Sequence, residues 1–213
     1  MSYEAKSFDH LLGIEGLSDG MLNNHFGLYA GYVANTNKLV EELGKYQVEG
    51  LTADPQYAEL KRRFGWEFDG MRLHELYFGN LTKEKAEFSE DSILGIQIKK
   101  DFGSSENWQK EYLATGAMRG IGWVVLYFDF FAQKLFNVWI GEHDGGHLAG
   151  AFPILVMDVF EHAYILDYGT KKADYISAFM KIIDWKVLND RYDWATKISE
   201  VKPAGIDHFG CRC

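Results

Sequence analysis

The chain has 213 residues, of which 47% are hydrophobic and 15% aromatic, so it can bury one large core and is not an intrinsically disordered protein. The formal net charge of −9 argues against nucleic-acid binding and means that only a local group of basic residues would attract a small anion. We expect no transmembrane helix, because no run of about 18 apolar residues occurs. The first residues lack the apolar stretch of a signal peptide, which favours a cytoplasmic protein.

The N-terminal part of the chain predicts a lead-in followed by one long helix. Residues 1–17 have the composition of an extended segment, and Ser18 is a typical N-cap for a helix that runs to about Gly44. His25 and Tyr32 lie seven residues apart in this helix, which is about two turns, so their side chains share one face. Without further information, His25 is best interpreted as a polar residue satisfied between packed helices.

The next segment predicts two shorter helices. Asp54 and Pro55 form a cap followed by a first-turn proline, and Gly65 is expected to end the helix that starts there. A further helix is expected from about Asp69. It places His74 on an apolar stripe, where most histidines are simply packed in the core.

The middle of the chain predicts two helices and then three strands. The helices are expected over 92–102 and 104–115, and the strands over 120–128, 135–140 and 152–157. The first strand is apolar on both faces and bounded by glycines, which is typical of a central strand. A hairpin connection is expected between the first two strands, and Asp158 directly follows the third.

Two closing helices are expected over 172–183 and 184–196, followed by a tail from 198 to 213. The only cysteines, Cys211 and Cys213, lie at the end of this tail and cannot form a disulfide framework. They could bind a soft metal, but a frayed terminus is the simpler interpretation.

One heptapeptide carries a specific resemblance. Asp158 and His162 are four residues apart and offer an oxygen and a nitrogen suited to iron, manganese or zinc, although such a pair alone is more often hydrogen-bonded or solvated. The whole segment 158–164, DVFEHAY, resembles the D-x-[WF]-E-H-[AST]-[FY] signature of the iron/manganese superoxide dismutases. Residues 24–37 are similar to the first helix of that family, and residues 74–78 resemble its H-x-x-Y-[WF] element.

The resemblance implies a mononuclear metal site and an activity. It implies that the metal ligands are three nitrogens and one oxygen, from His25, His74, Asp158 and His162. A fifth position would be left for water or hydroxide. The resemblance implies one iron or manganese ion per subunit and is compatible with either metal. The implied function is superoxide dismutase, in which the metal cycles by one electron and superoxide becomes oxygen and hydrogen peroxide.

The resemblance also implies roles around the metal. Tyr32 would be the gateway residue, and Trp123 would form part of the wall of the site. Many iron enzymes of the family place a glutamine at the position of Gly70, so the outer-sphere group must come from elsewhere, and we expect it to be His143 of the glycine-rich loop. His147 is expected to be structural. The chain lacks the family's His-His pair before Tyr32, and its shorter spacing predicts a regular helix there.

Further roles concern the substrate and the oligomer. Arg191 is expected either to attract the anionic substrate or to form an ordinary surface salt bridge. Glu161 would reach across a two-fold interface to His162 of the other subunit, which implies a homodimer and leaves a tetramer open. A second bridge of the family is absent here, because Ile165 stands where the family has a tyrosine, and apolar packing is expected instead.

These inferences predict an α+β fold in two domains. Residues 1–88 are expected to form an N-terminal helical hairpin, and residues 89–213 a domain of three antiparallel strands surrounded by helices, with the metal between the two. Two alternative functions stay open. One is a dimeric iron- or manganese-binding protein with little or no dismutase turnover. The other, a zinc hydrolase, is weaker because Glu161 is better explained as a bridge than as a general base.

Overall fold

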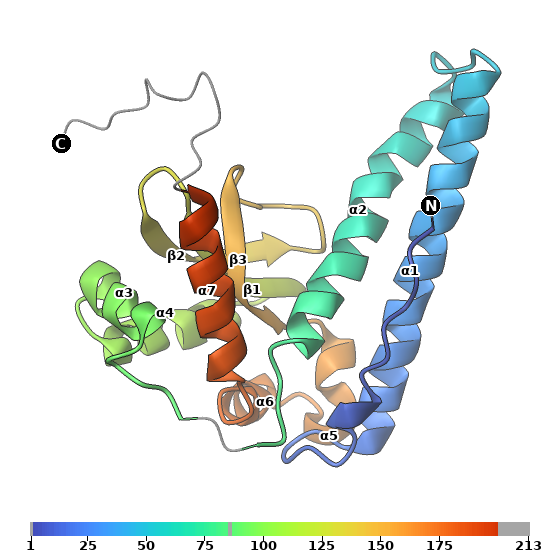
Figure 1. Cartoon of the computed structure of the whole chain (residues 1–213). Coiled ribbons are helices and arrows are strands. Elements are labelled where there is room, and N and C mark those ends of the chain that lie inside the picture. The colour runs from blue at the N-terminus through green and yellow to red at the C-terminus, as the bar shows by residue number, and fades with distance from the viewer. Residues whose placement is uncertain (1, 85–86, 200–213) are drawn as a thin grey trace.

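The computed structural model describes residues 2–84 and 87–199, and these form a helical hairpin beside a sheet covered by helices (Figure 1). The helices are α1 (Asp19–Val48), α2 (Pro55–Phe78), α3 (Ile93–Phe102), α4 (Ser105–Gly116), α5 (Ile165–Tyr168), α6 (Lys172–Phe179) and α7 (Trp185–Ser199). The strands are β1 (Gly122–Asp129), β2 (Lys134–Gly141) and β3 (Ala151–Asp158), and two 3₁₀ turns are η1 (Asp9–Leu11) and η2 (Glu161–Ala163). The α+β fold is therefore confirmed, whereas the division into two domains at residue 88 stays a prediction.

Helix α1 begins where its sequence predicts. The Ser18 hydroxyl accepts a hydrogen bond from the backbone N–H of Met21, which satisfies one of the free donors of the first turn. The helix continues without interruption to Val48, so the expectation of a regular helix through His25 and Tyr32 is confirmed. Both side chains consequently lie on the same side of α1.

Helix α2 corrects one prediction. It begins as expected, with Asp54 capping and Pro55 in the first position, but it runs through Gly65 to Phe78 as a single helix. The predicted end at Gly65 is wrong because a glycine inside a helix costs only about 1 kcal/mol, and α2 packs along α1. Arg63 and His74, which are eleven residues or about three turns apart, therefore share one face.

Helix α6 is also shorter than predicted. It ends at Phe179, whereas the sequence favoured residue 183. The segment that follows pairs with the chain after α2 instead: Ile183 forms a bridge with Leu81, and the N–H of Thr82 donates to the carbonyl of Ile182 at 2.9 Å. These long-range bonds replace the helical ones, so the helix stops early.

The sheet is antiparallel with the strand order β2-β1-β3, which confirms β1 as the central strand. Seven of its eight residues are buried, as its two-sided apolar sequence requires. Trp123 on β1 pairs with Asp158 on β3, so the register brings a tryptophan beside the residue that ends the third strand. Helix α7 packs on β3, and α4 packs on β1 and β2 (Figure 1).

The hairpin is tied to the sheet by Asn80, just after α2. Its side-chain amide donates to the carbonyl of Val156 at 3.2 Å and accepts from the N–H of the same residue at 3.1 Å. Asn80 is fully buried, so both bonds form away from water, where an unmet polar group is costly. The end of α2 is thereby fixed against the middle of β3.

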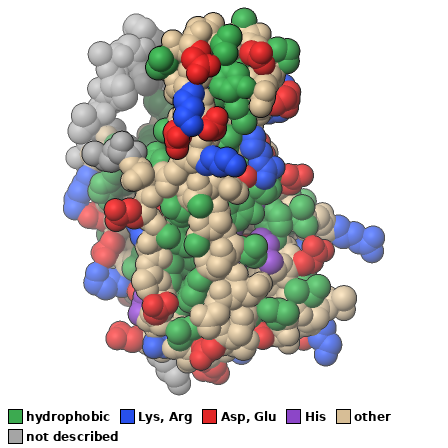
Figure 2. All heavy atoms as spheres, turned by 90° about the vertical axis from the view of Figure 1, so that its right-hand side faces the viewer, with side chains coloured by type: hydrophobic (Ala, Val, Ile, Leu, Met, Phe, Trp, Pro, Cys, Tyr) green, Lys and Arg blue, Asp and Glu red, His purple; other side chains and the backbone are tan. Residues whose placement is uncertain are grey.

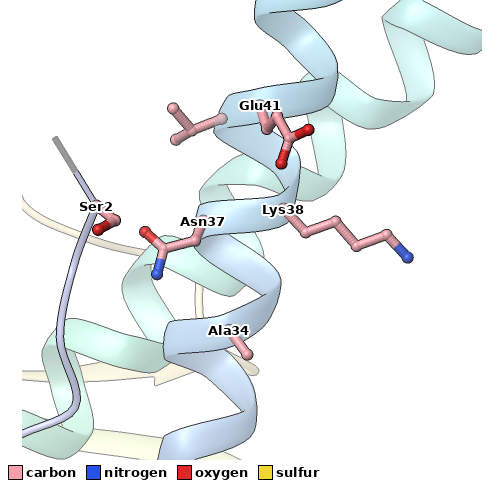
Figure 3. A pocket seen from close by; sticks show the side chains of 6 residues that line it. Ser2, Ala34, Asn37, Lys38 and Glu41 are labelled. Atoms are coloured by element: carbon pink, nitrogen blue, oxygen red, sulfur yellow. The ribbon is translucent and has the colours of Figure 1, made fainter.

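The outer face of the hairpin shows side chains of both charges (Figure 2). The start of the chain lies along α1 and is held by reciprocal 2.8 Å hydrogen bonds between Asn37 and the backbone of Tyr3. A shallow hollow beside these bonds is lined by Ser2, Ala34, Asn37, Lys38, Val40 and Glu41 (Figure 3).

No helix of the described chain has the length and apolar character that crossing a membrane requires.

Candidate metal centre

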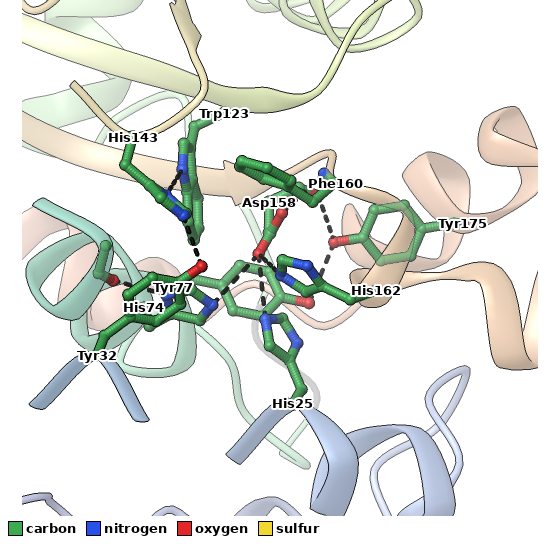
Figure 4. Close-up of polar contacts among 11 residues, drawn as sticks. His25, Tyr32, His74, Tyr77, Trp123, His143, Asp158, Phe160, His162 and Tyr175 are labelled. Carbon is green, nitrogen blue, oxygen red and sulfur yellow. Dashed lines mark hydrogen bonds and ion pairs between the residues drawn. The ribbon is translucent and has the colours of Figure 1, made fainter. Parts of the chain in front are cut away.

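Four side chains from four different elements meet between the hairpin and the sheet. His25 comes from α1, His74 from α2, Asp158 from the end of β3 and His162 from the turn η2 (Figure 4). The Nε2 atoms of His25 and His162 each lie 3.1 Å from Oδ2 of Asp158, and Nε2 of His74 lies 3.7 Å from the same oxygen. Three imidazole nitrogens thus surround one carboxylate oxygen.

The tautomer of His74 is set by the backbone of its own helix. Its Nδ1 lies 2.6 Å from the carbonyl oxygen of Gly70, which can only accept, so Nδ1 carries the hydrogen. The other nitrogen, Nε2, is therefore a bare acceptor. It is buried and has no hydrogen-bond partner among the described residues, an arrangement that is costly unless something else binds there. This unpaired nitrogen, aimed at the other three side chains, fits a metal ion.

The sizes and ligand types agree with that interpretation. The four ligand atoms lie within 4.8 Å of one another. A metal bound at about 2.0–2.2 Å leaves its ligand atoms at most about 4.4 Å apart, so the cluster would need to contract by only about 0.4 Å. Three imidazoles and one carboxylate suit iron or manganese, and the set contains no thiolate. Cys211 and Cys213 lie outside the described residues.

Burial sets the charge state of the cluster. Burial lowers the pKa of His25, and burial together with the nearby His25 lowers the pKa of His74, so both imidazoles are neutral ligands at neutral pH. Burial opposes ionisation of Asp158, but His162 and His25 outweigh it and hold the pKa of Asp158 below its usual range. His25 and His74 therefore offer neutral nitrogens beside an ionised Asp158, which is the protonation state that metal binding needs. Asp158 outweighs burial at His162 and raises the pKa of that imidazole, so His162 is the ligand from which a metal would have to displace a proton.

A second layer of hydrogen bonds lies beside the cluster. The indole N–H of Trp123 donates to Nδ1 of His143 at 3.1 Å, so Nδ1 is an acceptor and the hydrogen of the neutral ring is on Nε2. That Nε2–H lies 2.8 Å from the hydroxyl oxygen of Tyr32 and donates to it. The structure thus brings together Tyr32, Trp123 and His143, which were singled out from the sequence. The hydroxyl hydrogen of Tyr32 remains available for another acceptor.

The Tyr32 ring explains why position 70 holds a glycine. A Cβ atom at position 70 would lie 2.7 Å from a carbon of the Tyr32 ring, closer than real Cβ atoms approach. The ring therefore occupies the space that a larger residue on α2 would fill. With no side chain available at position 70, the polar group that faces Tyr32 comes from His143 on the loop.

The loop that carries His143 is fixed at both ends. Nε2 of His147 lies 2.8 Å from the carbonyl oxygen of His143, and its Nδ1 lies 2.7 Å from the Tyr127 hydroxyl, which agrees with a structural role for His147. At the other end, the indole N–H of Trp66 donates to the Glu142 carboxylate at 2.9 Å. These bonds join the loop to α2 and to β1.

Sequence reasoning missed Trp66, whose ring lies 4.5 Å from that of His143 and 5.5 Å from that of Tyr32, between ring centroids. The predicted helix end at Gly65 hid it, because a continuous α2 places Trp66 on the side of His74. Tyr175 was also missed as a site residue. Its hydroxyl donates to the backbone carbonyl of Asp158 at 2.8 Å and lies 3.1 Å from the Tyr77 hydroxyl (Figure 4).

Arg191 and Glu161, two further residues singled out from the sequence, do not belong to the four-residue cluster. The Arg191 guanidinium donates to the carbonyls of Leu76 and Ile154 and to Asn80, all at 3.0–3.1 Å. Burial lowers the pKa of Arg191 to about 10. These partners are neutral, and within residues 2–84 and 87–199 no ion pair of Arg191 occurs, so the surface salt bridge considered for it is wrong there. Its part-buried side chain instead links α7, α2 and β3. Glu161 is exposed beside His162.

Comparison with known proteins identifies the family. Residues 77–191 match the C-terminal domain of the iron/manganese superoxide dismutases. The chain is 38% identical to a superoxide dismutase [Fe] of Aquifex pyrophilus over 90% of this chain and 92% of that protein. It is 35% identical to superoxide dismutase [Mn] 2 of Haloferax volcanii, over 83% of this chain and 87% of that protein.

The chain belongs to the iron/manganese superoxide dismutase family. A superoxide dismutase [Fe] of Cupriavidus metallidurans, 35% identical over 92% of this chain and 100% of its own length, agrees with this. The matched domain contains Asp158 and His162, whereas His25 and His74 lie in the part covered by the full-length relatives. The resemblance noted in the sequence is therefore confirmed, and relatives named for iron and for manganese both occur.

Proposed function

We propose that this protein is a superoxide dismutase that uses one iron or manganese ion per subunit. The observation that carries the proposal is the buried cluster in which His74 Nε2 has no partner among the described residues. Family membership supports the same reaction. His25, His74, Asp158 and His162 would hold the metal, whose one-electron redox couple would convert two superoxide ions and two protons to oxygen and hydrogen peroxide.

The protein's own contribution would be to shape the site and deliver protons. Trp123 fixes the tautomer of His143, and His143 orients the Tyr32 hydroxyl by donating to its oxygen. Burial raises the pKa of Tyr32 to about 12, so this hydroxyl keeps its proton at neutral pH and can donate it to an anionic acceptor. We assign Tyr32 the gateway role, and His143 and Trp123 its orientation.

The same residues would restrict access to the cluster. His25, His74 and Asp158 are at most 1% exposed, and the rings of Phe160 and His143 stack at 4.7 Å over one side. Excluding water strengthens each electrostatic interaction inside the site. His162 is the most accessible of the four, with 20% of its side chain exposed. We assign the route of a small anion to the side of the cluster where Tyr32 lies.

We further propose a homodimer in which Glu161 bonds to His162 of a second subunit. The support is local. Glu161 is exposed one residue before a candidate ligand, and two neighbouring apolar side chains, Ile165 and Leu166, are 48% and 60% exposed. A paired surface would cover these side chains. Sedimentation of the wild type and of Glu161→Ala tests this, since the variant should dissociate more readily. A tetramer and the cytoplasmic location stay predictions.

The function is tested by preparing the apoprotein and loading it separately with iron and with manganese. Dismutation of superoxide by at least one form, at close to one ion per chain, is the expected result. A His143→Ala variant loaded in parallel should bind the metal and dismute more slowly. Stoichiometric binding of both metals without turnover would contradict the enzyme and favour the alternative of a metal-binding protein of the same fold.

A further inference from the structure

Arg63 lies at the entrance to the site. Its guanidinium carbon is 3.7 Å from the centroid of the Trp66 ring, and that ring contacts both Tyr32 and His143. The side chain of Arg63 is 52% exposed. Stacking on Trp66 therefore holds an exposed cation on the ring that contacts both Tyr32 and His143.

The ion pair that Arg63 forms is oriented. Its Nε and terminal nitrogens lie 2.9 and 2.7 Å from Oε1 of Glu67, whose side chain is only 4% exposed. Asn35 donates to the other oxygen of Glu67 at 3.3 Å. The negative end of the pair is thus inside the protein and the positive end faces solvent, so the pair presents its positive end to an approaching ion.

One acidic group opposes this field. The Glu142 carboxylate accepts from the Trp66 indole N–H, so it lies at the edge of the same ring. Its backbone has a φ of +53°, an uncommon value for a residue other than glycine. Trp66 therefore contacts a cation over its face and an anion at its edge, and the net pull on an anion depends on both.

The net charge of the molecule opposes the approach of an anion. The chain carries a net charge of −9, and charges of both signs are mixed on the outer face of the hairpin (Figure 2). Arg191, for which the sequence left open an anion-attracting role or a salt bridge, is part-buried and bonded to carbonyl groups and an amide. Arg63 is, by contrast, a cation whose charge acts on both Tyr32 and His143, against the larger influence of Glu67 on Tyr32 and of Glu142 on His143.

We infer that Arg63, held on Trp66, is a guiding residue that draws the superoxide anion to the Tyr32 entrance, and that Glu142 opposes it. The inference rests on the proposed dismutase function. Superoxide dismutases are a standing example of enzymes near the diffusional ceiling of about 10⁸–10⁹ M⁻¹ s⁻¹, so their kcat/KM responds to the rate of encounter. A charge at the entrance then changes kcat/KM in a salt-dependent way.

The test compares Arg63→Gln, Arg63→Glu and Arg63→Lys with the wild-type holoenzyme. Activity is expressed per bound metal and measured from about 0.01 to 1 M ionic strength, over which the screening length falls from about 30 to 3 Å. We expect kcat/KM at low salt to fall about twofold for Gln and about fourfold for Glu, and to be restored by Lys. At the highest salt the variants should match the wild type.

Arg62→Gln is the matched control. Arg62 is the preceding residue, its side chain is 74% exposed, and it pairs with Glu59 on the outside of α2. The Arg62→Gln variant removes the same charge from the chain and leaves the contact between Arg63 and Trp66 in place. Its kcat/KM should stay at the wild-type value, whereas an equal loss in both variants would show that only net charge matters and would overturn the role of Arg63.

Glu142→Gln removes a negative charge and should therefore change kcat/KM in the opposite direction. The glutamine oxygen can still accept from Trp66, so the contact is kept while the charge is lost. We expect kcat/KM at low salt to rise about twofold, which structural damage would not produce. A salt-independent loss in the Arg63 variants would also contradict guidance. If the wild type itself does not dismute superoxide, the proposed function fails, which is a separate outcome.

Discussion

At the four-residue cluster every side chain comes from a different element, whereas the entrance beside it consists of side chains from α1, α2 and one loop. The cluster is almost entirely buried and its geometry is fixed by α1, α2, β3 and η2. Trp66 and Tyr32 are half-buried and Arg63 is exposed, and a few hydrogen bonds, one ion pair and ring contacts position them. The difference indicates that the cluster determines whether the reaction is possible, and the entrance adjusts its rate.

The largest effect is expected when a candidate ligand of the cluster is changed. Asp158→Asn removes the only negative charge of the cluster while keeping the size of the side chain. Because loss of a second-layer partner of a metal site already costs about 10–100-fold, we expect activity to fall by more than about 100-fold, with little metal retained. Metal analysis and a dismutation assay check this. Asp184→Asn, the same change at the start of α7, should leave metal content unaltered.

Trp123→Phe tests whether the layer next to the cluster behaves like the cluster or like the entrance. The variant removes the donor to His143 Nδ1, so the hydrogen of the ring is no longer confined to Nε2 and Tyr32 loses its fixed partner. We expect activity per bound metal to fall about 10-fold. In Trp108→Phe the lost bond is the one to Asn137, away from the site. Equal losses in the two variants would contradict the assignment.

Arg191→Ala separates stability from substrate attraction. The variant leaves buried carbonyls of Leu76 and Ile154 without their donor, so we expect the free energy of unfolding to fall by about 2–4 kcal/mol. Activity per bound metal should stay within about twofold of the wild type. Denaturant titration and kinetics measure the two quantities. A salt-dependent drop in kcat/KM with unchanged stability would restore the anion-attracting role that the sequence left open.

Gly70→Ala tests the contact between α2 and the Tyr32 ring, where the cluster meets the entrance. The new Cβ would meet the Tyr32 ring at 2.7 Å, so we expect a loss of about 1–3 kcal/mol in unfolding free energy and a slower reaction as the ring moves. Gly65→Ala, on the same helix with nothing within 4 Å of the new atom, should stabilise by up to about 1 kcal/mol. Thermal unfolding of the two variants gives the comparison, and a shift of the same sign in both would contradict it.

The sequence predicted most of the buried region and little of the entrance. An apolar strand located Asp158 and helical spacing placed His25 and Tyr32 on one face, but only the family resemblance predicted that these segments, far apart in the chain, form one site. Their roles in binding metal stay proposals. Arg63 and Trp66 could not be predicted, because Gly65 suggested a helix end that packing against α1 overrides. The burial of Arg191 depends on its bonds to Leu76 and Ile154, which lie far away in the chain.

The positions of the four candidate ligands along the chain also determine when the site can exist. Asp158 follows His25 by 133 residues, which a ribosome adding about 5–20 residues per second needs about 7–27 s to synthesise. The hairpin with His25 and His74 is therefore made well before Asp158 and His162 emerge. An ion can therefore enter a complete site only after residue 162 has left the ribosome, so metal binding must follow the synthesis of the hairpin.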